Sequence, residues 1–246
     1  MIGFQPWLRV DIIVAAGDGS AQAAKAATAT IPIVFGVASD PIQVGLVTSL
    51  NRPTGNITGI TFFAAALGAK RMGFAHELVP GATSIGLLAN PNNPSSEPEI
   101  RAVKEAAATF GLPLVVIPAE NEVEVDAGFA AMIQRGVGAL LVGTDGVLLD
   151  YRDRLADLAA RHALPTIYPV REFVAAGGLM SYGTSIPDAF RQVGVYAGRI
   201  LRGEKPAELP TMLPSKFELA INLTTAKALG LTIPLTLQYA ADEVVE

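Results

Sequence analysis

Cysteine is absent from the 246-residue sequence. The chain therefore forms no disulfide, no thiolate metal site, no thiolate nucleophile and no lipid-anchored cysteine. Histidine is scarce as well, and the two histidines, His76 and His162, fall inside predicted helices. A lone helical histidine is more often a packing or surface residue than a catalyst, and two of them supply no set of metal ligands. We expect no bound metal and no cofactor.

Positive charge and long apolar runs are also limited. Lysine and arginine total 18 residues against 23 aspartates and glutamates, a formal charge of -5. This balance argues against the basic stripe that nucleic-acid binding requires, so we expect no nucleic-acid partner. The longest apolar runs, such as Ile12–Ala16 and Ala139–Val142, are far shorter than the roughly 20 residues that span a bilayer. We expect no membrane insertion, and residues 1–9 lack the pattern of an export signal.

The common catalytic motifs are missing. The sequence contains no Gly-x-Ser-x-Gly, no His-Glu-x-x-His and no Gly-x-x-x-x-Gly-Lys-Ser/Thr segment, so we expect no enzyme. Residues 17–22 imitate a dinucleotide-binding loop, because they follow a predicted strand, open a helix and precede Asp40 at the end of the next strand. Gln22 replaces the third glycine, and Asp18 would place a negative charge beside a pyrophosphate. A nucleotide-dependent Rossmann-like enzyme therefore stays an alternative only.

Half of the residues are hydrophobic, which suffices for one large domain or two lobes. Short β-branched or aliphatic runs alternate with longer Ala-rich stretches, as in an α/β fold with doubly wound parallel sheets. The predicted strands are Val10–Ala15, Ile31–Val37, Ser84–Ala89, Leu112–Pro118, Gly138–Val142, Pro165–Tyr168 and Gly178–Tyr182. The predicted helices are Ala21–Ala29, Ile42–Leu50, Ile100–Phe110, Glu122–Gln134, Leu149–His162 and Asp188–Arg202.

Glycine and proline interrupt this alternation at Gly55–Thr61, Ser181–Ser185 and Leu209–Glu218. Two strand–helix units precede the first interruption, and four or five lie between it and the second. We therefore predict two lobes of unequal size, with the chain crossing between them at these three segments.

The candidate ligand-binding residues lie in the loops that follow the predicted strands, because ligands of open parallel sheets bind at the carboxyl ends of strands. Helix starts there favour a carboxylate, acidic side chains suit an ammonium group, and tyrosines suit a ring or a cation. The candidates are Gly17, Asp18, Ser20, Ser39, Asp40, Asn90, Asn92, Asp145, Tyr168, Glu172 and Tyr182.

Simpler roles are open for several of these residues. Ser39 and Asp40 precede a predicted helix, and the alternative role for both is that of a helix cap only. Asn90–Pro94 and Asp145 with Gly146 are typical turn sequences. Glu172 lies at the start of a predicted helix, where the alternative to ligand binding is a solvent-exposed residue of the first turn.

A family resemblance extends from about Val10 to Glu246. Several separate motifs, in the same order, resemble the substrate-binding proteins of a group of bacterial ABC transporters linked to aromatic amino acids. These motifs are Ile31–Phe35, Ser39–Pro41, Ser49–Pro53, Gly55–Gly59, Leu78–Gly81, Asn90–Pro94, Leu164–Phe173, Gly177–Gly183, Lys216–Asn222 and Ala226–Leu231.

The resemblance implies a type I periplasmic-binding-protein fold, in which two lobes close on a small solute in the cleft between them. One lobe would hold residues 1–61 and 184–208, and the other would hold residues 62–183 and 209–246. The implied function is a periplasmic solute receptor that delivers an amino acid or similar zwitterion, including one with an aromatic side chain, to a transporter permease. Asp145 or Glu172 would bind the amine, and Tyr168 and Tyr182 would flank the side chain.

The sequence departs from that family at its start, where members carry an export signal and then a strand, a helix and a second strand before the segment that matches residues 10–16. The smaller lobe is therefore expected to be incomplete. Its uncovered strand edge favours self-association, so we expect a homodimer more readily than for a complete member. The effector-binding domain of a transcription regulator, which shares this fold, is a further alternative.

Overall fold

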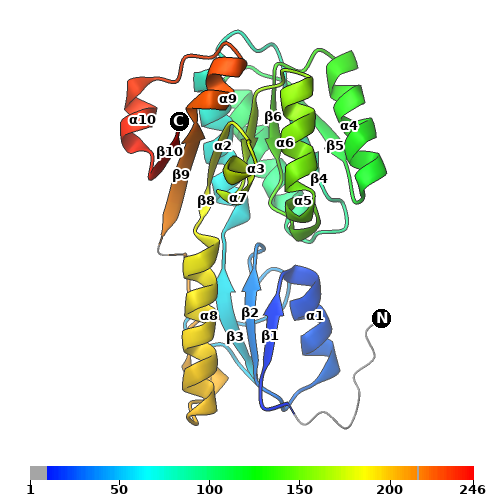
Figure 1. The fold of residues 1–246 in the computed structure, drawn as a ribbon. Coiled ribbons are helices and arrows are strands. Elements are labelled where there is room, and N and C mark those ends of the chain that lie inside the picture. Colours follow the sequence, from blue (N-terminus) through cyan, green and yellow to red (C-terminus); the bar gives the residue numbers. More distant parts are fainter. Residues whose placement is uncertain (1–9, 215) are drawn as a thin grey trace. The chain divides into compact units, whose positions relative to one another are not determined.

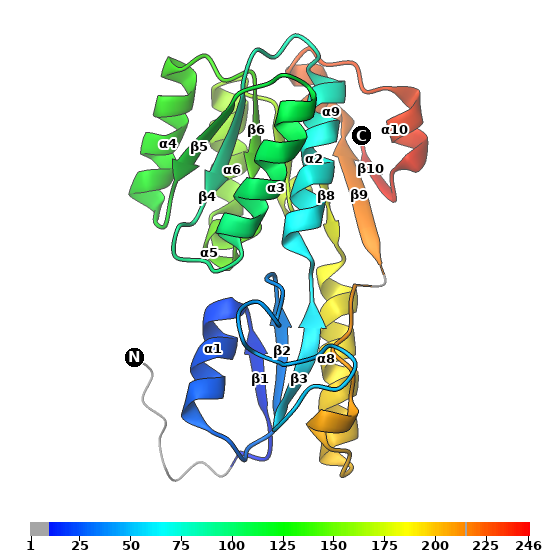
Figure 2. The ribbon, with the colours of Figure 1, turned by 180° about the vertical axis from the view of Figure 1, so that it is seen from behind.

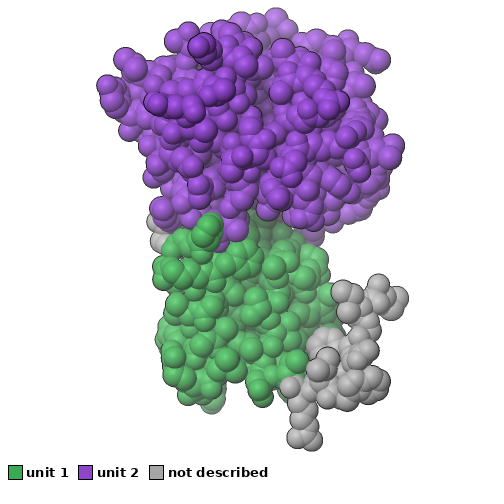
Figure 3. All heavy atoms as spheres, in the orientation of Figure 1, with its two compact units in different colours: residues 1–62, 187–213 green, residues 63–186, 214–246 purple. Residues whose placement is uncertain are grey.

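The computed structural model describes residues 10–214 and 216–246. The chain divides into two compact units, which are coloured separately in Figure 3: unit 1 comprises Met1–Phe62 and Pro187–Leu213, and unit 2 comprises Phe63–Ile186 and Pro214–Glu246. Residues 1–9, which we expected to lack an export signal and to begin the first lobe, lie outside the described residues. Among the residues described, none of the helices has the length and apolar character needed to cross a membrane.

Unit 1 contains a three-stranded parallel sheet in the order β1-β2-β3 (Figure 1). The strands are β1 (Ile13–Ala16), β2 (Ile33–Val37) and β3 (Ile57–Thr61), and the helices are α1 (Asp18–Ala27), α8 (Ile186–Leu201) and the 3₁₀ turn η1 (Pro206–Glu208). Side chains alternate across a strand, so the β2 neighbours Val34 and Phe35 face opposite layers. Phe35 packs with α1, and Val34 packs with α8. The small sheet is thus covered on both faces.

The close approach of two strands in unit 1 requires a glycine. A Cβ on Gly59 of β3 would lie 2.6 Å from the Phe35 ring and still closer to the Phe35 carbonyl oxygen. At the other side of the sheet, β1 is an edge strand on which Val14 is 51% exposed. Self-association through this edge stays a prediction.

Unit 2 contains a seven-stranded sheet in the order β10-β9-β8-β7-β6-β4-β5 (Figures 1 and 2). Neighbouring strands are parallel except for β8 and β9. The strands are β4 (Ile85–Ala89), β5 (Leu114–Pro118), β6 (Ala139–Val142), β7 (Thr166–Tyr168), β8 (Met180–Thr184), β9 (Phe217–Asn222) and β10 (Glu243–Val245). The helices are α2 (Ala64–Leu78), α3 (Ser96–Thr109), α4 (Glu122–Gln134), α5 (Gly146–Asp150), α6 (Arg152–Arg161), α7 (Glu172–Ala175), α9 (Leu223–Ala228) and α10 (Leu235–Ala240).

Two apolar clusters fix the layers of unit 2. Residues of α2, α3, α9 and α10 pack against one face of the sheet, together with Ile85 and Ile167. Residues of α4, α5, α6 and α7 pack against the other face, together with Leu88 and Tyr168. The α/β fold class with doubly wound, mostly parallel sheets is therefore confirmed. All five parallel strands from β4 to β8 have their carboxyl ends along one edge of the sheet, where α3, α5 and α7 begin.

Some predicted elements are wrong. Residues 42–50 form turns instead of a helix, because Gly45 adopts the left-handed conformation (φ 71°) after a single turn closed by Leu46 N–H on the Pro41 carbonyl. No strand was predicted between residues 55 and 61, where the structure has the fully buried strand β3. The helix predicted at Leu149–His162 is two helices, α5 and α6, which meet at Tyr151.

Candidate functional site

In unit 1 the loops after β1 and β2 are joined by one buried carboxylate. Asp18, which is 6% exposed, accepts the backbone N–H groups of Ala38 and Ser39, each at 3.1 Å, and the Ser39 hydroxyl. The structure thus brings two predicted site residues together. Their polar atoms satisfy each other, which is a structural role for both side chains.

The other predicted residues of unit 1 also make local hydrogen bonds. The Ser20 hydroxyl donates to the carbonyls of Ala16 (2.6 Å) and Gly17 (2.8 Å). Asp40 accepts the N–H of Ile42 at 2.8 Å and so caps the following turn. Gly17 has a φ of 94° and, as the N-cap residue of α1, supplies no side chain to cap it. The first turn of α1 also contains the Asp18 carboxylate, whose negative charge opposes the partial positive charge of the helix start.

In unit 2 the loops after β4 and β6 are joined through Asp145. One Asp145 oxygen caps α5 by accepting the Leu148 N–H at 3.0 Å. The other accepts the side-chain amides of Asn90 (3.2 Å) and Asn93 (2.8 Å). Asn90 and Asp145 are both predicted site residues, and the structure places them in direct contact. Asp145 already has three donors, which reduces its capacity to bind an ammonium group.

Asn92 lies in the same loop and turns toward β5. Its N–H donates to the Asn90 side-chain oxygen at 2.9 Å, and its side-chain amide donates to the Glu120 carboxylate. The loop after β4 is therefore a hydrogen-bonded turn tied to the loops after β5 and β6. This geometry agrees with the rigid-turn alternative for Asn90–Pro94.

Tyr168 lies in the core of unit 2. Its side chain is 0% exposed, and its ring stacks on Phe173 with centroids 4.7 Å apart and an interplanar angle of 15°. Burial raises the pKa of the hydroxyl well above its usual value. We therefore do not assign Tyr168 to ligand contact.

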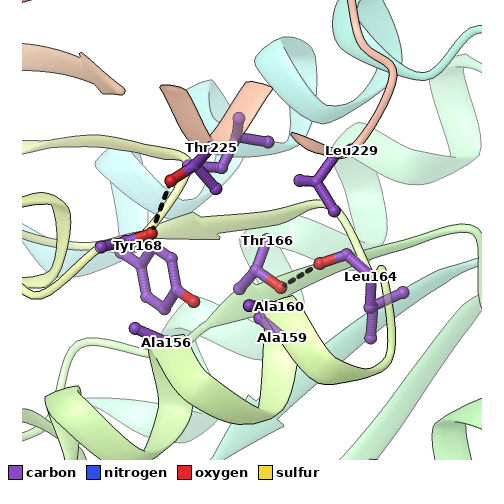
Figure 4. Close-up of a pocket in the computed structure, with 11 residues that line it drawn as sticks. Ala156, Ala159, Ala160, Leu164, Thr166, Tyr168, Thr225 and Leu229 are labelled. Atoms are coloured by element: carbon purple, nitrogen blue, oxygen red, sulfur yellow. Dashed lines mark hydrogen bonds between the residues drawn. The ribbon is translucent and has the colours of Figure 1, made fainter. Parts of the chain in front are cut away.

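Tyr168 also lines a small pocket, shown in Figure 4. The empty space in the pocket, counted together with the open solvent at its mouth, is about 180 Å³. Alanine, leucine and glycine residues form most of its lining. The hydroxyls of Thr166 and Thr225 in its wall donate to the carbonyls of Leu164 (2.9 Å) and Gly177 (2.8 Å), as the dashed lines show. The lining comes from α6, from β7 with the segment before it, from the segment before β8, and from α9 and the residue after it, and Tyr168 is its one predicted site residue.

Glu172 differs from the other acidic candidates. It is the first residue of α7, follows the carboxyl end of β7 and is half-buried. Its Oε2 atom is buried and has no hydrogen-bond partner among the described residues. A buried carboxylate oxygen without a partner is costly, so this atom suits a cationic donor supplied from outside.

The loop that carries Glu172 rests on the next strand. A Cβ on Gly183 of β8 would lie 2.9 Å from the carbonyl carbon of Pro169 and closer still to its oxygen. On the opposite face of β8, the Tyr182 ring meets Phe74 edge to face at 5.3 Å and stacks on Phe217 at 6.4 Å. Tyr182 is half-buried, so part of the ring or hydroxyl stays accessible.

A buried ion pair behind this edge was not predicted. Arg71 of α2 and Glu99 of α3 are 1% and 2% exposed, and they bind each other, Thr144 and the Tyr182 carbonyl. The sequence does contain a sign of this burial, because Arg71 has the helical spacing that places it on the same face as Leu67, Ala75 and Leu78. No helix was predicted for this segment. In the sequence, Ser96 and Glu99 have the spacing of a capping box, but in the structure Ser95 is the N-cap residue of α3 and Glu99 pairs with Arg71.

The two units are α/β units of the kind found in two-lobed binding proteins. A family model described as ABC transporter substrate binding protein matches residues 8–245. The chain therefore belongs to the ABC transporter substrate-binding protein family, and the resemblance inferred from its sequence is confirmed.

Relatives of known type support the same assignment. A tyrosine-binding protein from Clostridioides difficile (strain R20291) is 27% identical over 221 residues, which are 90% of this chain. The chain spans 63% of the length of that relative. The crystal structure of an ABC domain from Streptococcus pneumonia in complex with L-Trp has a TM-score of 0.87 and 25% identity, and the match covers 96% of this chain and 81% of that one.

Two further solved structures bear on the fold. A conserved domain protein from Vibrio cholerae O1 biovar El Tor strain N16961 has a TM-score of 0.87 and 27% identity, with 95% of this chain and 78% of that chain covered. A LacI family transcriptional regulator from Mycobacterium smegmatis has a TM-score of 0.61 and 14% identity, with 86% and 77% covered. The second likeness shows the fold alone. The description of the family and the name of the Clostridioides difficile relative both denote binding of a substrate.

Proposed function

We propose that this protein is the solute receptor of an ABC import system and that it binds an amino acid with an aromatic side chain. The family supports a small-molecule substrate. The names of two relatives, a tyrosine-binding protein and a domain in complex with L-Trp, support the aromatic amino acid. In this proposal the protein acts in the periplasm and passes its ligand to a permease.

The observation that carries the residue assignment is the buried, unpartnered Oε2 atom of Glu172, as judged over the described residues. Asp145, the other acidic candidate of unit 2, already accepts three hydrogen bonds from its own unit. Glu172 is therefore the better acceptor for the ammonium group of an amino acid. The half-buried Tyr182 ring, held by Phe74 and Phe217, adds aromatic surface on the face of β8 that α2 covers.

The first test is isothermal titration of the purified chain with L-tyrosine, L-tryptophan, L-phenylalanine, L-leucine and NAD. The proposal expects binding of at least one aromatic amino acid in preference to L-leucine and NAD. Binding of NAD alone would favour the dinucleotide alternative, and absence of aromatic amino-acid binding would refute the proposed ligand class.

The second test isolates the amine contact. Glu172→Gln keeps the shape of the side chain and removes its charge, so the affinity for the aromatic amino acid is expected to fall about tenfold to a hundredfold. The matching ligand without the amine, such as 3-(4-hydroxyphenyl)propionate for L-tyrosine, is expected to bind the wild type and the variant equally. Glu97→Gln, at a residue whose side chain is 89% exposed in the same unit, is the control and is expected to change neither affinity. Equal loss for both ligands would contradict an amine contact at Glu172.

A further inference from the structure

The Arg71–Glu99 pair connects the first turn of α3, the loop after β6 and strand β8 of unit 2. Glu99 accepts the Thr144 N–H at 2.9 Å with one oxygen, and its other oxygen accepts the Thr144 hydroxyl at 3.2 Å and the Arg71 guanidinium. Arg71 Nη2 also donates to the Thr144 hydroxyl at 3.0 Å, and Arg71 Nη1 donates to the Tyr182 carbonyl at 3.1 Å. Thr144 follows β6, Tyr182 lies in β8, and Glu99 lies in the first turn of the helix that follows β4.

These bonds continue into the residues that face the proposed ligand site. Thr144 precedes Asp145, and the Thr144 carbonyl accepts the Asn93 side-chain amide at 3.1 Å. Asp145 then binds Asn90 and caps α5. The ion pair thus fixes the position of the β6 loop directly and that of the β4 loop through one further residue.

The spacing of the two helices makes this geometry specific. A Cβ on Gly68 of α2 would lie 2.9 Å from Glu99 Cγ and 3.0 Å from Val103 of α3. The glycine lets the helices approach until Glu99 passes between them toward Thr144. Because packed interiors are dense, Glu99 has little freedom to move away from Arg71.

Stability alone does not explain why a buried ion pair occupies this position. Arg71 Nε is buried and has no hydrogen-bond partner within the described part of the chain. Removing two charges from water costs several kcal/mol each, and replacing a buried pair by apolar side chains is often neutral or stabilising. Burial also lowers the pKa of Arg71 and raises that of Glu99, which reflects the same cost. What the pair supplies that apolar residues do not is a fixed direction for Thr144 and Tyr182.

We propose that Arg71 and Glu99 are positioning residues, which hold the loop after β6 and the end of β8 in the conformation that binds the ligand. This inference rests on the proposed function, because it assigns those strand ends to ligand binding. It predicts that the pair contributes to affinity more than to stability.

The test compares three variants. The double variant Arg71→Met with Glu99→Met fills the site with apolar side chains of similar length and leaves no unpaired charge. The double variant is expected to fold with a melting temperature near that of the wild type and to bind L-tyrosine or L-tryptophan about tenfold more weakly. Relative to the wild type, amide exchange at Thr144 and Leu148 is expected to speed up more than amide exchange in β4. Arg71→Lys, whose single ammonium cannot reach Glu99, Thr144 and Tyr182 together, is expected to be intermediate. Arg154→Lys, in an exposed ion pair with Asp126 of the same unit, is the control and is expected to match the wild type.

Several outcomes would overturn the inference. One is a folded double variant with wild-type affinity and unchanged exchange at Thr144 and Leu148. If the double variant does not fold, Arg71→Lys decides, and wild-type affinity and exchange in that variant would overturn the inference. If the wild type binds no aromatic amino acid, the proposed function fails separately. Amide exchange then decides: selective loosening of the β6 loop supports positioning, and uniform exchange across unit 2 overturns it.

Discussion

Gly183→Ala is expected to destabilise unit 2 and weaken ligand binding, because the added methyl group has no room. A Cβ at this position would lie 2.9 Å from the carbonyl carbon of Pro169, and the atoms in the way belong to the backbone, which cannot rotate aside. The β7–α7 loop must shift or β8 must bend. Overpacking of this kind typically costs about 1–3 kcal/mol, and the backbone contact places this variant near about 3 kcal/mol. Glu172 follows Pro169 by three residues, so its carboxylate moves with the loop.

The assay is urea denaturation followed by far-ultraviolet circular dichroism, together with titration of the aromatic amino acid that binds the wild type. Gly73→Ala is the matched control in the same unit. Gly73 lies within α2, and a Cβ there meets no described atom within 4 Å apart from its chain neighbours and the nearby backbone of its own helix. Alanine is the better helix former, so the control is expected to be more stable than the wild type by about 0.5–1 kcal/mol. Gly183→Ala with the unfolding midpoint and affinity of the wild type would refute the reasoning.

Two further predictions concern buried polar groups. Asp18→Ala leaves the donors of Ala38 and Ser39 without their acceptor and is expected to lower the free energy of unfolding by about 3 kcal/mol in urea denaturation. Asp40→Ala, which removes only a turn cap, is expected to lower it by about 1 kcal/mol. Equal losses in the two variants would contradict the structural role of Asp18. Burial raises the pKa of Tyr168, so its contribution to stability is present below its usual pKa of about 10 and is lost as the pH rises toward the raised value. Tyr168→Phe is therefore expected to lessen the fall in the free energy of unfolding between about pH 9 and about pH 11, and a fall identical to that of the wild type would contradict the burial.

Five of the seven strands of the larger sheet, β4 to β8, could be predicted, and β4 and β6 are fully buried, continuous apolar runs. Strands β9 and β10 were not predicted. The runs at Ser84–Ala89 and Gly138–Val142 correspond to β4 and β6, and the helix Glu122–Gln134 has the bounds of α4. The pattern failed where a tertiary contact decides the conformation. Gly45 ends the first turn after Pro41, so an amphipathic run that looks helical forms turns. Strand β3 was missed because Gly59 resembles a break in the sequence, whereas in the structure it admits the Phe35 ring.

The candidate site could be predicted by location more than by role. The rule that ligands bind at strand carboxyl ends selected loops that the structure does place at one edge of the unit-2 sheet. It did not separate side chains that hold the loops together from side chains that are free to bind, because both kinds are short and polar. Asp145 and Asn90 bind each other across two loops, a contact between residues 55 positions apart that no local pattern reveals.

The distribution of unsatisfied atoms separates these roles. In a loop whose polar atoms all have partners, a ligand must break an existing bond to make a new one, so such residues add rigidity and little net affinity. A site that has to discriminate a zwitterion needs at least one strong group left without an internal partner and held in place by its neighbours. Over the described residues of unit 2, Glu172 Oε2 meets the first condition, and the contact of Pro169 with Gly183 meets the second. The network from Arg71 through Thr144 to Asp145 has a different part in this division of roles: its polar atoms bind each other and hold the loops after β4 and β6.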